Sequence, residues 1–230
     1  MQDKSNIGNL FDSIALTYDR FNHVLSLDSD KRWRRRAVSR MTHSDSVLDV
    51  AAGTGDLSIE LVRQNKAGTV TGMDISLKMM EIGQEKVSAK GLEDRIIFQE
   101  GSALDMPFED NSFNAVTCAY GVRNFSDLDK GLSEMFRVLK VGGQLMILEF
   151  SYPENRFIRF FYDIYFSRIM PLVGKALSRN KGAYLYFRDS VKGFIWGEKM
   201  KEKIEAAGFI NVKYRVMTFG ITTVYYASKD

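Results

Sequence analysis

The stretch that most constrains the fold runs from Ser46 to Asp56 and reads SVLDVAAGTGD. Its start, residues 47–50, is apolar apart from Asp49 and predicts a strand that is buried on both faces. Gly53 and Gly55 follow, and two glycines two positions apart allow a tight turn in which a ligand can approach the main chain closely. Apolar residues then recur at helical spacing, so we expect a helix to begin near Asp56. A strand, a glycine turn and a helix in this order open a nucleotide-binding α/β domain.

An acidic residue follows the next predicted strand at the offset that a ribose-binding residue needs. Residues 69–74 predict this strand, and Asp74 at its end lies 19 positions beyond Gly55. A carboxylate at this strand end can accept hydrogen bonds from both hydroxyls of a ribose. The turn and the acid together therefore predict a nucleoside site.

The glycine turn does not suit a dinucleotide. The third glycine of a G-x-G-x-x-G pattern is replaced by Ser58, and Asp56 would place a negative charge against a pyrophosphate. A ligand with a ribose but no phosphate fits better, and S-adenosylmethionine combines a ribose, an adenine, an amino acid and a cationic sulfonium. The run DVAAGTGD resembles motif I of the class I S-adenosylmethionine-dependent methyltransferases. A dehydrogenase turn and a turn without any ligand are the alternatives.

Composition narrows the class of protein further. The 230 residues suffice for one α/β domain, and a net charge of +3 is too small to indicate a nucleic-acid partner. Cys118 is the only cysteine, so no internal disulfide can form and a reducing cytoplasm is expected. The first six residues lack the apolar core of a signal peptide, and no run approaches the roughly 18 apolar residues of a spanning helix. We therefore expect a cytoplasmic protein.

The pattern along the chain predicts a single Rossmann-like domain with four segments. These are a helical N-terminal cap at 1–42, a cofactor-binding core at 43–150, an aromatic-rich insertion on the acceptor side at 151–197, and a C-terminal helix and hairpin at 198–230. Alternating signals in the core predict strands near 46–51, 69–74, 95–100, 113–119 and 143–150, with helices near 56–65, 76–90 and 127–139. The hairpin adds strands at 210–217 and 221–227. A sheet of seven mostly parallel strands, with the last one antiparallel, is expected.

Two local signals set the ends of elements in this core. Ser76 is expected to cap the second helix, because a serine hydroxyl can accept a hydrogen bond from the first turn. The pair Gly142–Gly143 is expected to form the turn between the third helix and the fifth strand.

The N-terminal segment suits a cap over the ligand pocket. Four residues recur at the spacing of an amphipathic helix: Phe11, Ile14, Ala15 and Tyr18. Tyr18, Asn22 and Trp33 are candidates for the pocket wall, with ordinary helix packing as the alternative. The five cations around Trp33 suit either an anionic membrane surface or a solvated face.

The insertion after the fifth strand is unusually aromatic. Residues 155–196 are rich in Phe, Tyr, Ile and Met, but arginines and an aspartate interrupt them, so this stretch cannot span a membrane. It suits the wall of an apolar acceptor pocket, a contact with a bilayer surface, or a dimer or core contact.

The loops after the third and fourth strands are expected to complete the site, because open α/β sheets bind ligands at the carboxyl ends of their strands. Ser102 and Ala103 follow the third strand, where a polar residue can hold the edge of an adenine. Arg123 and Asn124 follow the fourth strand. They are either a pair of hydrogen-bond donors or a water-positioning pair beside the molecule that accepts the methyl group. The alternative is an ion pair and cap at the start of a helix.

Three motifs together resemble the ubiquinone/menaquinone-biosynthesis C-methyltransferases. One is Y-D-x-F-N-x-x-x-S at residues 18–26, followed by W-R at 33–34. The second is R-V-L-K-x-G-G-x-x-x-x-L-E-F-S at 137–151, and the third is G-V-R-N at 121–124. They are specific as a set, whereas R-V-L-K-x-G-G alone occurs in many methyltransferases.

The resemblance implies methylation of a ring carbon of a polyprenylated quinol, with S-adenosylmethionine as the cofactor and no metal. It favours conversion of demethylmenaquinol to menaquinol, because the chain is short and has no N-terminal extension. Cofactor residues carried over by position are Thr54, Asp74, Ser102 and Ala103, to which the turn glycines Gly53 and Gly55 are added. Ala119 is also assigned to the donor site, although it stands where the family often has a polar residue.

Catalysis by such an enzyme needs the sulfonium methyl group and the ring carbon to be aligned, water to be excluded and the proton of the quinol to be carried away. Arg123 is expected to stabilise the phenolate charge or, with Asn124, to orient a water that accepts the proton. Tyr18 and Asp19 are further candidates. Neither His23 nor His43 is at a sheet carboxyl end, so no histidine base is expected.

Two other functions stay open at this stage. One is methylation of another lipophilic or small acceptor, including the benzoquinol of the ubiquinone pathway, and the other is a donor-binding module without turnover. A nucleic-acid methyltransferase is not expected, because residues 119–122 do not resemble its N-P-P-Y-like loop. The expected partners are a polyprenyl quinol, the inner face of a membrane through peripheral contact, and a second copy in a homodimer.

Overall fold

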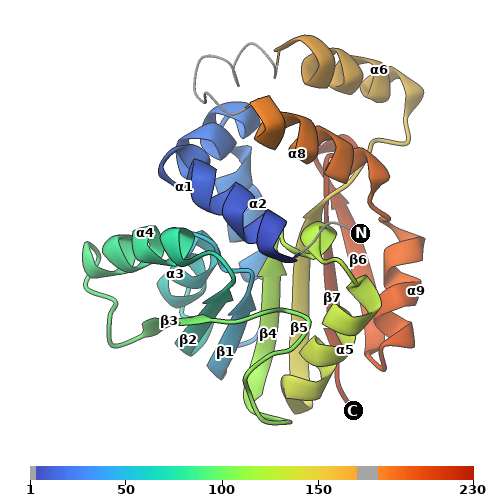
Figure 1. Cartoon of the computed structure of the whole chain (residues 1–230). Helices are drawn as coiled ribbons and strands as arrows, with labels where there is room; N and C mark the ends of the chain where they lie inside the picture. The colour runs from blue at the N-terminus through green and yellow to red at the C-terminus, as the bar shows by residue number, and fades with distance from the viewer. Residues whose placement is uncertain (1–3, 170–180) are drawn as a thin grey trace.

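Seven strands form one sheet in the order β3-β2-β1-β4-β5-β7-β6 (Figure 1). The structure is a computed structural model that describes residues 4–169 and 181–230. The strands are β1 (Ser44–Val50), β2 (Ala67–Asp74), β3 (Ile96–Glu100), β4 (Phe113–Ala119), β5 (Leu139–Phe150), β6 (Ile210–Met217) and β7 (Thr222–Ser228). Only β7 runs against its neighbours, β5 and β6. The expected seven-stranded, mostly parallel sheet with an antiparallel last strand is confirmed.

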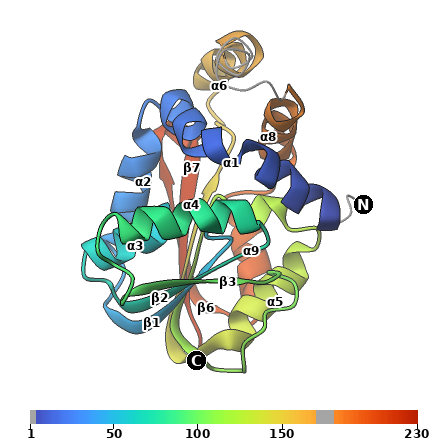
Figure 2. The same ribbon diagram turned by 60° about the vertical axis from the view of Figure 1, so that its left-hand side comes forward.

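Helices cover both faces of this sheet (Figure 2). One face carries α2 (Ser29–Val38), α3 (Asp56–Arg63) and α4 (Leu77–Ser88), and the other carries α5 (Leu128–Val138) and α9 (Glu198–Ala206). Each side has its own buried apolar cluster, one with Trp33 and Leu61 and the other with Leu132 and Ile204. The three core helices start and end within two residues of the expected positions, and Ser76 caps α4 by accepting a hydrogen bond from Met79 N.

The remaining helices of the described part of the chain gather at the carboxyl end of the sheet (Figures 1 and 2). They are α1 (Lys4–Ser26), α6 (Arg156–Ile164), the π-helical turn η2 (Tyr165–Ile169) and α8 (Lys181–Gly193). Short 3₁₀ turns, η1 (Val122–Asn124) and η3 (Thr218–Gly220), lie at the same end. The helical cap and the helical insertion are therefore confirmed as elements, while residues 170–180 of the insertion lie outside the described part of the chain.

The glycine pair at 142–143 is not the turn that the sequence predicts. Strand β5 already begins at Leu139, and the pair lies inside it. The register slips there, since Phe113 pairs with Leu139 but Ala115 pairs with Gln144. Hydrogen bonds to the chain end explain this irregularity, because Gly142 N donates to Lys229 O and Lys229 N donates to Gly143 O.

Candidate active site

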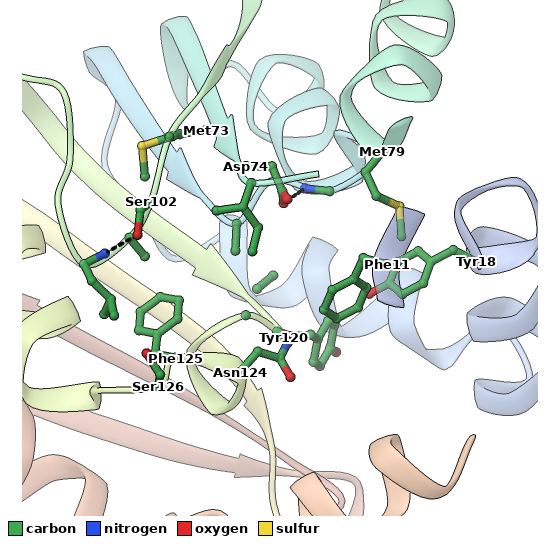
Figure 3. A pocket seen from close by; sticks show the side chains of 18 residues that line it. Phe11, Tyr18, Met73, Asp74, Met79, Ser102, Tyr120, Asn124, Phe125 and Ser126 are labelled. Carbon is green, nitrogen blue, oxygen red and sulfur yellow. Dashed lines mark hydrogen bonds between the residues drawn. The ribbon is translucent and has the colours of Figure 1, made fainter. Parts of the chain in front are cut away.

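A cavity of about 350 Å³ opens at the carboxyl ends of the central strands (Figure 3). Five segments that are distant in sequence line it. They are α1 (Phe11, Tyr18), the glycine turn (Ala51, Gly53), the end of β2 with the start of α4 (Met73, Asp74, Ile75, Met79), the loop after β3 (residues 101–104), and the loop after β4 (residues 119–121 and 124–126). The cavity is therefore where the sequence predicts a nucleoside site.

The two glycines of the turn have different roles. Gly53 has a φ of +56°, lines the cavity and donates its N–H to Asp74 Oδ2 at 2.8 Å. Gly55 has a φ of +77° and does not line the cavity, but a Cβ at this position would lie 2.7 Å from the ring of Phe98. Both backbones are left-handed and favour glycine, and Gly55 is also required for packing against Phe98 of β3.

Asp74 presents an oriented carboxylate to the cavity. Its Oδ2 accepts the Gly53 N–H, and its Oδ1 accepts the N–H of Ser76 at 2.9 Å. Burial raises the pKa of Asp74, while these backbone donors act in the opposite direction. The two backbone bonds fix the carboxylate at the end of β2, as a group that binds ribose hydroxyls requires.

Thr54 points away from the cavity into a network of charged groups. Its Oγ1 donates to Asp19 Oδ1 at 2.6 Å, and Lys86 Nζ donates to Asp19 at 2.9 Å and to Thr54 at 3.1 Å. Lys86 also pairs with Asp56. The network fastens α1 to the glycine turn and to α4, so the side chain predicted to contact the donor is used here to hold the cap.

A second cation completes this network on the side of α2. Arg34 Nη2 donates to Asp30 at 2.6 Å and to Asp56 at 2.8 Å, and His23 Nδ1 lies 2.9 Å from Asp30. Ligand atoms of the histidine and the two aspartates lie within 4.8 Å of one another. Arg34 pairs with both aspartates and Lys86 pairs with Asp56, so each carboxylate of the cluster already has a cationic partner. Burial raises the pKa of Asp56, but Arg34 and Lys86 outweigh it and hold this pKa below its usual value.

The loop after β3 forms one wall of the cavity. Ser102 and Ala103 both line it, as the sequence predicts, and Ser102 Oγ accepts the N–H of Leu104 at 3.2 Å (Figure 3). The serine hydroxyl keeps its own proton for donation to a ligand. Met73 and Phe125 add apolar surface to the same wall. A polar edge beside an apolar slot suits an adenine.

The loop after β4 brings an unexpected aromatic residue to the cavity. Ala119 lines it as predicted, and Tyr120 follows with a φ of +60°, which is unusual for a residue other than glycine. Its ring stacks on Phe150 with centroids 4.4 Å apart. Gly121 makes this path possible, because a Cβ there would lie 2.7 Å from Ala51 and from Cys118. No sequence signal indicated the left-handed tyrosine.

Arg123 does not present its guanidinium to the cavity. Its side chain is 4% exposed, and its Nη1 lies 2.9 Å from Oε1 of Glu149, which is itself 1% exposed. The guanidinium lies 5.3 Å from the ring centroids of both Phe150 and Phe187, which contact each other edge-on. Burial raises the pKa of Glu149 and Arg123 opposes this rise. These are the contacts of a buried ion pair that joins η1, β5 and α8, and the direct catalytic role of Arg123 stays a prediction.

Asn124, the other member of the predicted catalytic pair, does line the cavity. Its Oδ1 accepts the hydroxyl proton of Tyr186 at 3.0 Å, and its Nδ2 lies 3.5 Å from Tyr120 O. Tyr186 belongs to α8, so the aromatic-rich insertion orients a cavity side chain. No pattern in the sequence indicates Tyr186 as a partner of Asn124, because only the fold brings α8 to η1.

The N-terminal cap contributes fewer pocket residues than the sequence predicts. Tyr18 lines the cavity, and so does Phe11 of the same helix face. Trp33 is instead a core residue, which donates its indole N–H to Thr218 Oγ1 at 2.7 Å and meets Phe150 edge-on. Asn22 does not line the cavity either. Neither histidine is among the lining residues, so the expectation that no histidine acts as the base stays compatible with this geometry.

Comparison with known proteins identifies close relatives. A family model described as the ubiE/COQ5 methyltransferase family matches residues 1–229. A protein from Bacteroides fragilis named demethylmenaquinone methyltransferase is 44% identical over 225 residues, which cover 97% of this chain and 92% of the relative. One of the same name from Thermus thermophilus is 41% identical, with 96% and 100% covered. The ubiquinone/menaquinone biosynthesis C-methyltransferase UbiE of Geobacter sulfurreducens is 42% identical, with 97% and 88% covered.

Solved structures share the architecture at much lower identity. The [4+2]-cyclase SpnF superposes with a TM-score of 0.70 at 17% identity and covers 97% of this chain and 96% of its own. Phosphoethanolamine N-methyltransferase 2 of Haemonchus contortus, solved in complex with S-adenosyl-L-methionine, gives 0.66 at 16% identity, with 95% and 57% covered. At these identities the likeness shows the fold alone, and one fold hosts many reactions.

The full-length similarity to the curated relatives is of a different order, because it extends over at least 96% of the chain at more than 40% identity in all three cases. The family resemblance expected from the three motifs is thereby confirmed. The chain belongs to the ubiE/COQ5 methyltransferase family and is an S-adenosylmethionine-dependent methyltransferase.

Proposed function

We propose that this enzyme methylates a ring carbon of demethylmenaquinol and thereby produces menaquinol. The observation that carries the proposal is the 44% identity, over nearly the whole of both chains, with a relative named demethylmenaquinone methyltransferase. The benzoquinol of the ubiquinone pathway is the second candidate acceptor, because relatives named ubiquinone/menaquinone biosynthesis C-methyltransferase are 40–42% identical.

The residues around the cavity fit the methyl donor. Asp74 would accept hydrogen bonds from the ribose hydroxyls, and the left-handed Gly53 leaves room beside its own backbone. Ser102 and Ala103 would hold the adenine, and Ala119 would lie under the donor at the end of β4. When bound, the donor supplies an electrophilic methyl group on a sulfonium.

Aromatic rings line the part of the cavity that faces the cap. Phe11, Tyr18 and Tyr120 all line it, from α1 and from the loop after β4 (Figure 3). The faces of such rings attract cations, and quaternary ammonium sites use the same interaction. These rings suit a sulfonium and an apolar quinol ring, and they exclude water from the space between the two.

Asn124 and Arg123 have different parts in this proposal. Asn124 lies at the cavity, where its amide can orient the ring hydroxyl of the acceptor or a water that takes its proton. Arg123 acts from behind the wall through its charge. Burial raises the pKa of the Tyr18 hydroxyl, and the guanidinium of Arg123 opposes this rise although it is paired with Glu149. A buried cation at this place stabilises a phenolate, the form in which a quinol ring carbon becomes nucleophilic.

The acceptor is a lipid, so the proposal includes peripheral contact of a cytoplasmic enzyme with the inner face of a membrane. No helix in the described ranges 4–169 and 181–230 is long and apolar enough to cross a bilayer. A homodimer, also expected from the sequence, stays a prediction.

The test uses the purified full chain with S-adenosylmethionine and short-chain acceptors. Demethylmenaquinol is compared with the ubiquinone-pathway benzoquinol and with a catechol, and products are identified by mass spectrometry. Carbon methylation of the naphthoquinol, at least about tenfold faster than that of either alternative, is the expected result. Preferential methylation of the catechol oxygen would refute the proposal, and so would a strain that lacks this protein and accumulates no demethylmenaquinone.

A further inference from the structure

Helix α6 exposes the side of itself that is most apolar. Phe157, Phe160 and Phe161 are 72%, 61% and 54% exposed. With 3.6 residues per turn, Phe157 and Phe160 lie nearly opposite Tyr162, and Tyr162 is the residue of α6 that is buried, among Tyr152 and other rings. The inner contact of α6 is therefore made by the tyrosine, and three phenylalanines cover the outer face. Contiguous exposed apolar surface of this kind marks an interaction site.

Two more exposed apolar residues lie at the same end of the molecule, and both have strained backbones. Phe219 in η3 is 77% exposed with a φ of +57°, and Leu27 between α1 and α2 is 80% exposed with a φ of +51°. A left-handed conformation is unfavourable for such residues. At both positions the side chain is nevertheless left exposed to solvent.

Local contacts connect these residues to the segment that leads into α6. A Cβ on Gly220, the neighbour of Phe219, would lie 3.1 Å from Pro153 Cα. Trp33 of α2 donates to Thr218 Oγ1, which ties η3 to the helix that follows Leu27. In both views α6 stands farthest out at the carboxyl end of the sheet (Figures 1 and 2). The exposed apolar residues therefore share the end of the molecule at which the cavity is found.

Cations accompany this apolar surface. Arg156 begins α6 and is exposed, and Arg32 is exposed at the start of α2, where its neighbour Lys31 is also exposed but pairs with Asp28 at 2.7 Å. Arg159 is held beside the helix start by bonds to Pro153 O and Glu154 O. Aromatic residues flanked by arginine and lysine are the composition of a helix that lies in the interface of an anionic bilayer.

We propose that the outer face of α6, together with Phe219 and Leu27, docks on a bilayer that contains anionic lipids. This inference rests on the proposed function, since an acceptor with a polyprenyl chain has to be reached from the bilayer. The charges favour a lipid surface over a second copy of the chain, because a two-fold symmetric contact would bring the same cations together. The phenylalanines enter the region between headgroups and acyl chains, and the cations contact the headgroups.

The experiment measures flotation of the full chain with vesicles of phosphatidylcholine, with and without about one third phosphatidylglycerol. The test variant is Phe157→Ser/Phe160→Ser, which changes only exposed side chains. The control variant is Ile97→Ser/Val141→Ser, which removes two apolar side chains that are 59% and 69% exposed on β3 and β5. Turnover of a short-chain demethylmenaquinol in solution, and of a long-chain one in vesicles, is measured for each protein.

The expected result is at least a tenfold loss of vesicle binding in the phenylalanine variant and less than a twofold change in the control. Arg156→Glu should weaken binding to the anionic vesicles alone. Turnover in solution should stay unchanged while turnover in vesicles falls. Wild-type protein that does not bind anionic vesicles, equal binding by both double variants, or a dimer that only the phenylalanine variant breaks would overturn the docking surface. Failure to turn over any quinol would instead overturn the proposed function, whatever the vesicles show.

Discussion

Asp74 offers the sharpest test of where the donor binds. The change is Asp74→Asn, which keeps the size of the side chain and removes its charge. A hydrogen bond to a charged group contributes about 1.5–3 kcal/mol net. Since about 1.4 kcal/mol corresponds to a factor of ten in affinity, loss of one such bond to a ribose hydroxyl raises the donor Kd roughly 10- to 150-fold.

The structure adds a second effect that has to be separated from the first. Both carboxylate oxygens accept backbone N–H groups, from Gly53 and from Ser76. An asparagine has one acceptor oxygen, so one of these N–H groups loses its partner and the turn is destabilised by about 1–3 kcal/mol. Urea unfolding without the donor measures this part alone.

The assay is titration calorimetry of the purified chain with S-adenosylmethionine. Asp49→Asn is the matched control, because Asp49 is buried beneath the same turn, bonds Ser58 Oγ at 2.7 Å and does not line the cavity. We expect the control to bind the donor within about twofold of wild type. A Kd for Asp74→Asn within about threefold of wild type, in a protein that is still folded, would refute the assignment of Asp74 to the ribose.

Three further changes test the interior of the fold. Burial raises the pKa of Asp49 to about 7 from 3.8, so the native state favours the protonated acid. As the pH rises between these two values, the free energy of unfolding should fall by up to about 1.4 kcal/mol per pH unit. Asp49→Asn should abolish that fall, and equal slopes in the two proteins between pH 5 and 7 would contradict this expectation. Arg123→Met leaves Glu149 buried without its partner and should lower the free energy of unfolding in urea by about 3–5 kcal/mol. Adding Glu149→Gln to the same chain should recover part of this loss. A double variant no more stable than the single one would count against the ion pair. Gly55→Ala combines a left-handed backbone with a Cβ that meets an aromatic ring at 2.7 Å, so thermal unfolding should show a larger loss than for Gly91→Ala, which has a φ of +62° and open space; similar losses would show that the ring yields.

The fold was predictable because its signals are local. Buried strands appear as short apolar runs, helices as apolar residues three and four apart, and both depend on neighbours within one or two turns of chain. The position of Asp74 also followed, because parallel strands bring their carboxyl ends to one edge. The turn predicted at the glycine pair 142–143 was wrong, because the pair lies inside β5. Its partner is Lys229, nearly 90 residues away, and hydrogen bonds to that residue draw the pair into β5.

The shape of the fold leaves the reaction open. A [4+2]-cyclase covers 97% of this chain with the same architecture, so the fold alone does not distinguish methylation from other chemistry. The distinction comes from the sequence, through motifs along the whole chain that relatives share at more than 40% identity. The architecture therefore identifies the fold, whereas the motifs in the sequence indicate the reaction.

The sequence by itself determined the order of strands and helices, the glycine turn and the acid that follows it. Only the tertiary structure decided which side chains reach the cavity. Thr54 turns to Asp19 of the cap, Arg123 turns to Glu149 in the core, and Tyr186 arrives from an insertion more than 60 residues beyond Asn124. The physical reason is that a backbone's local conformation follows from its neighbours in sequence, whereas a polar side chain takes the best partner that packing brings within hydrogen-bonding distance.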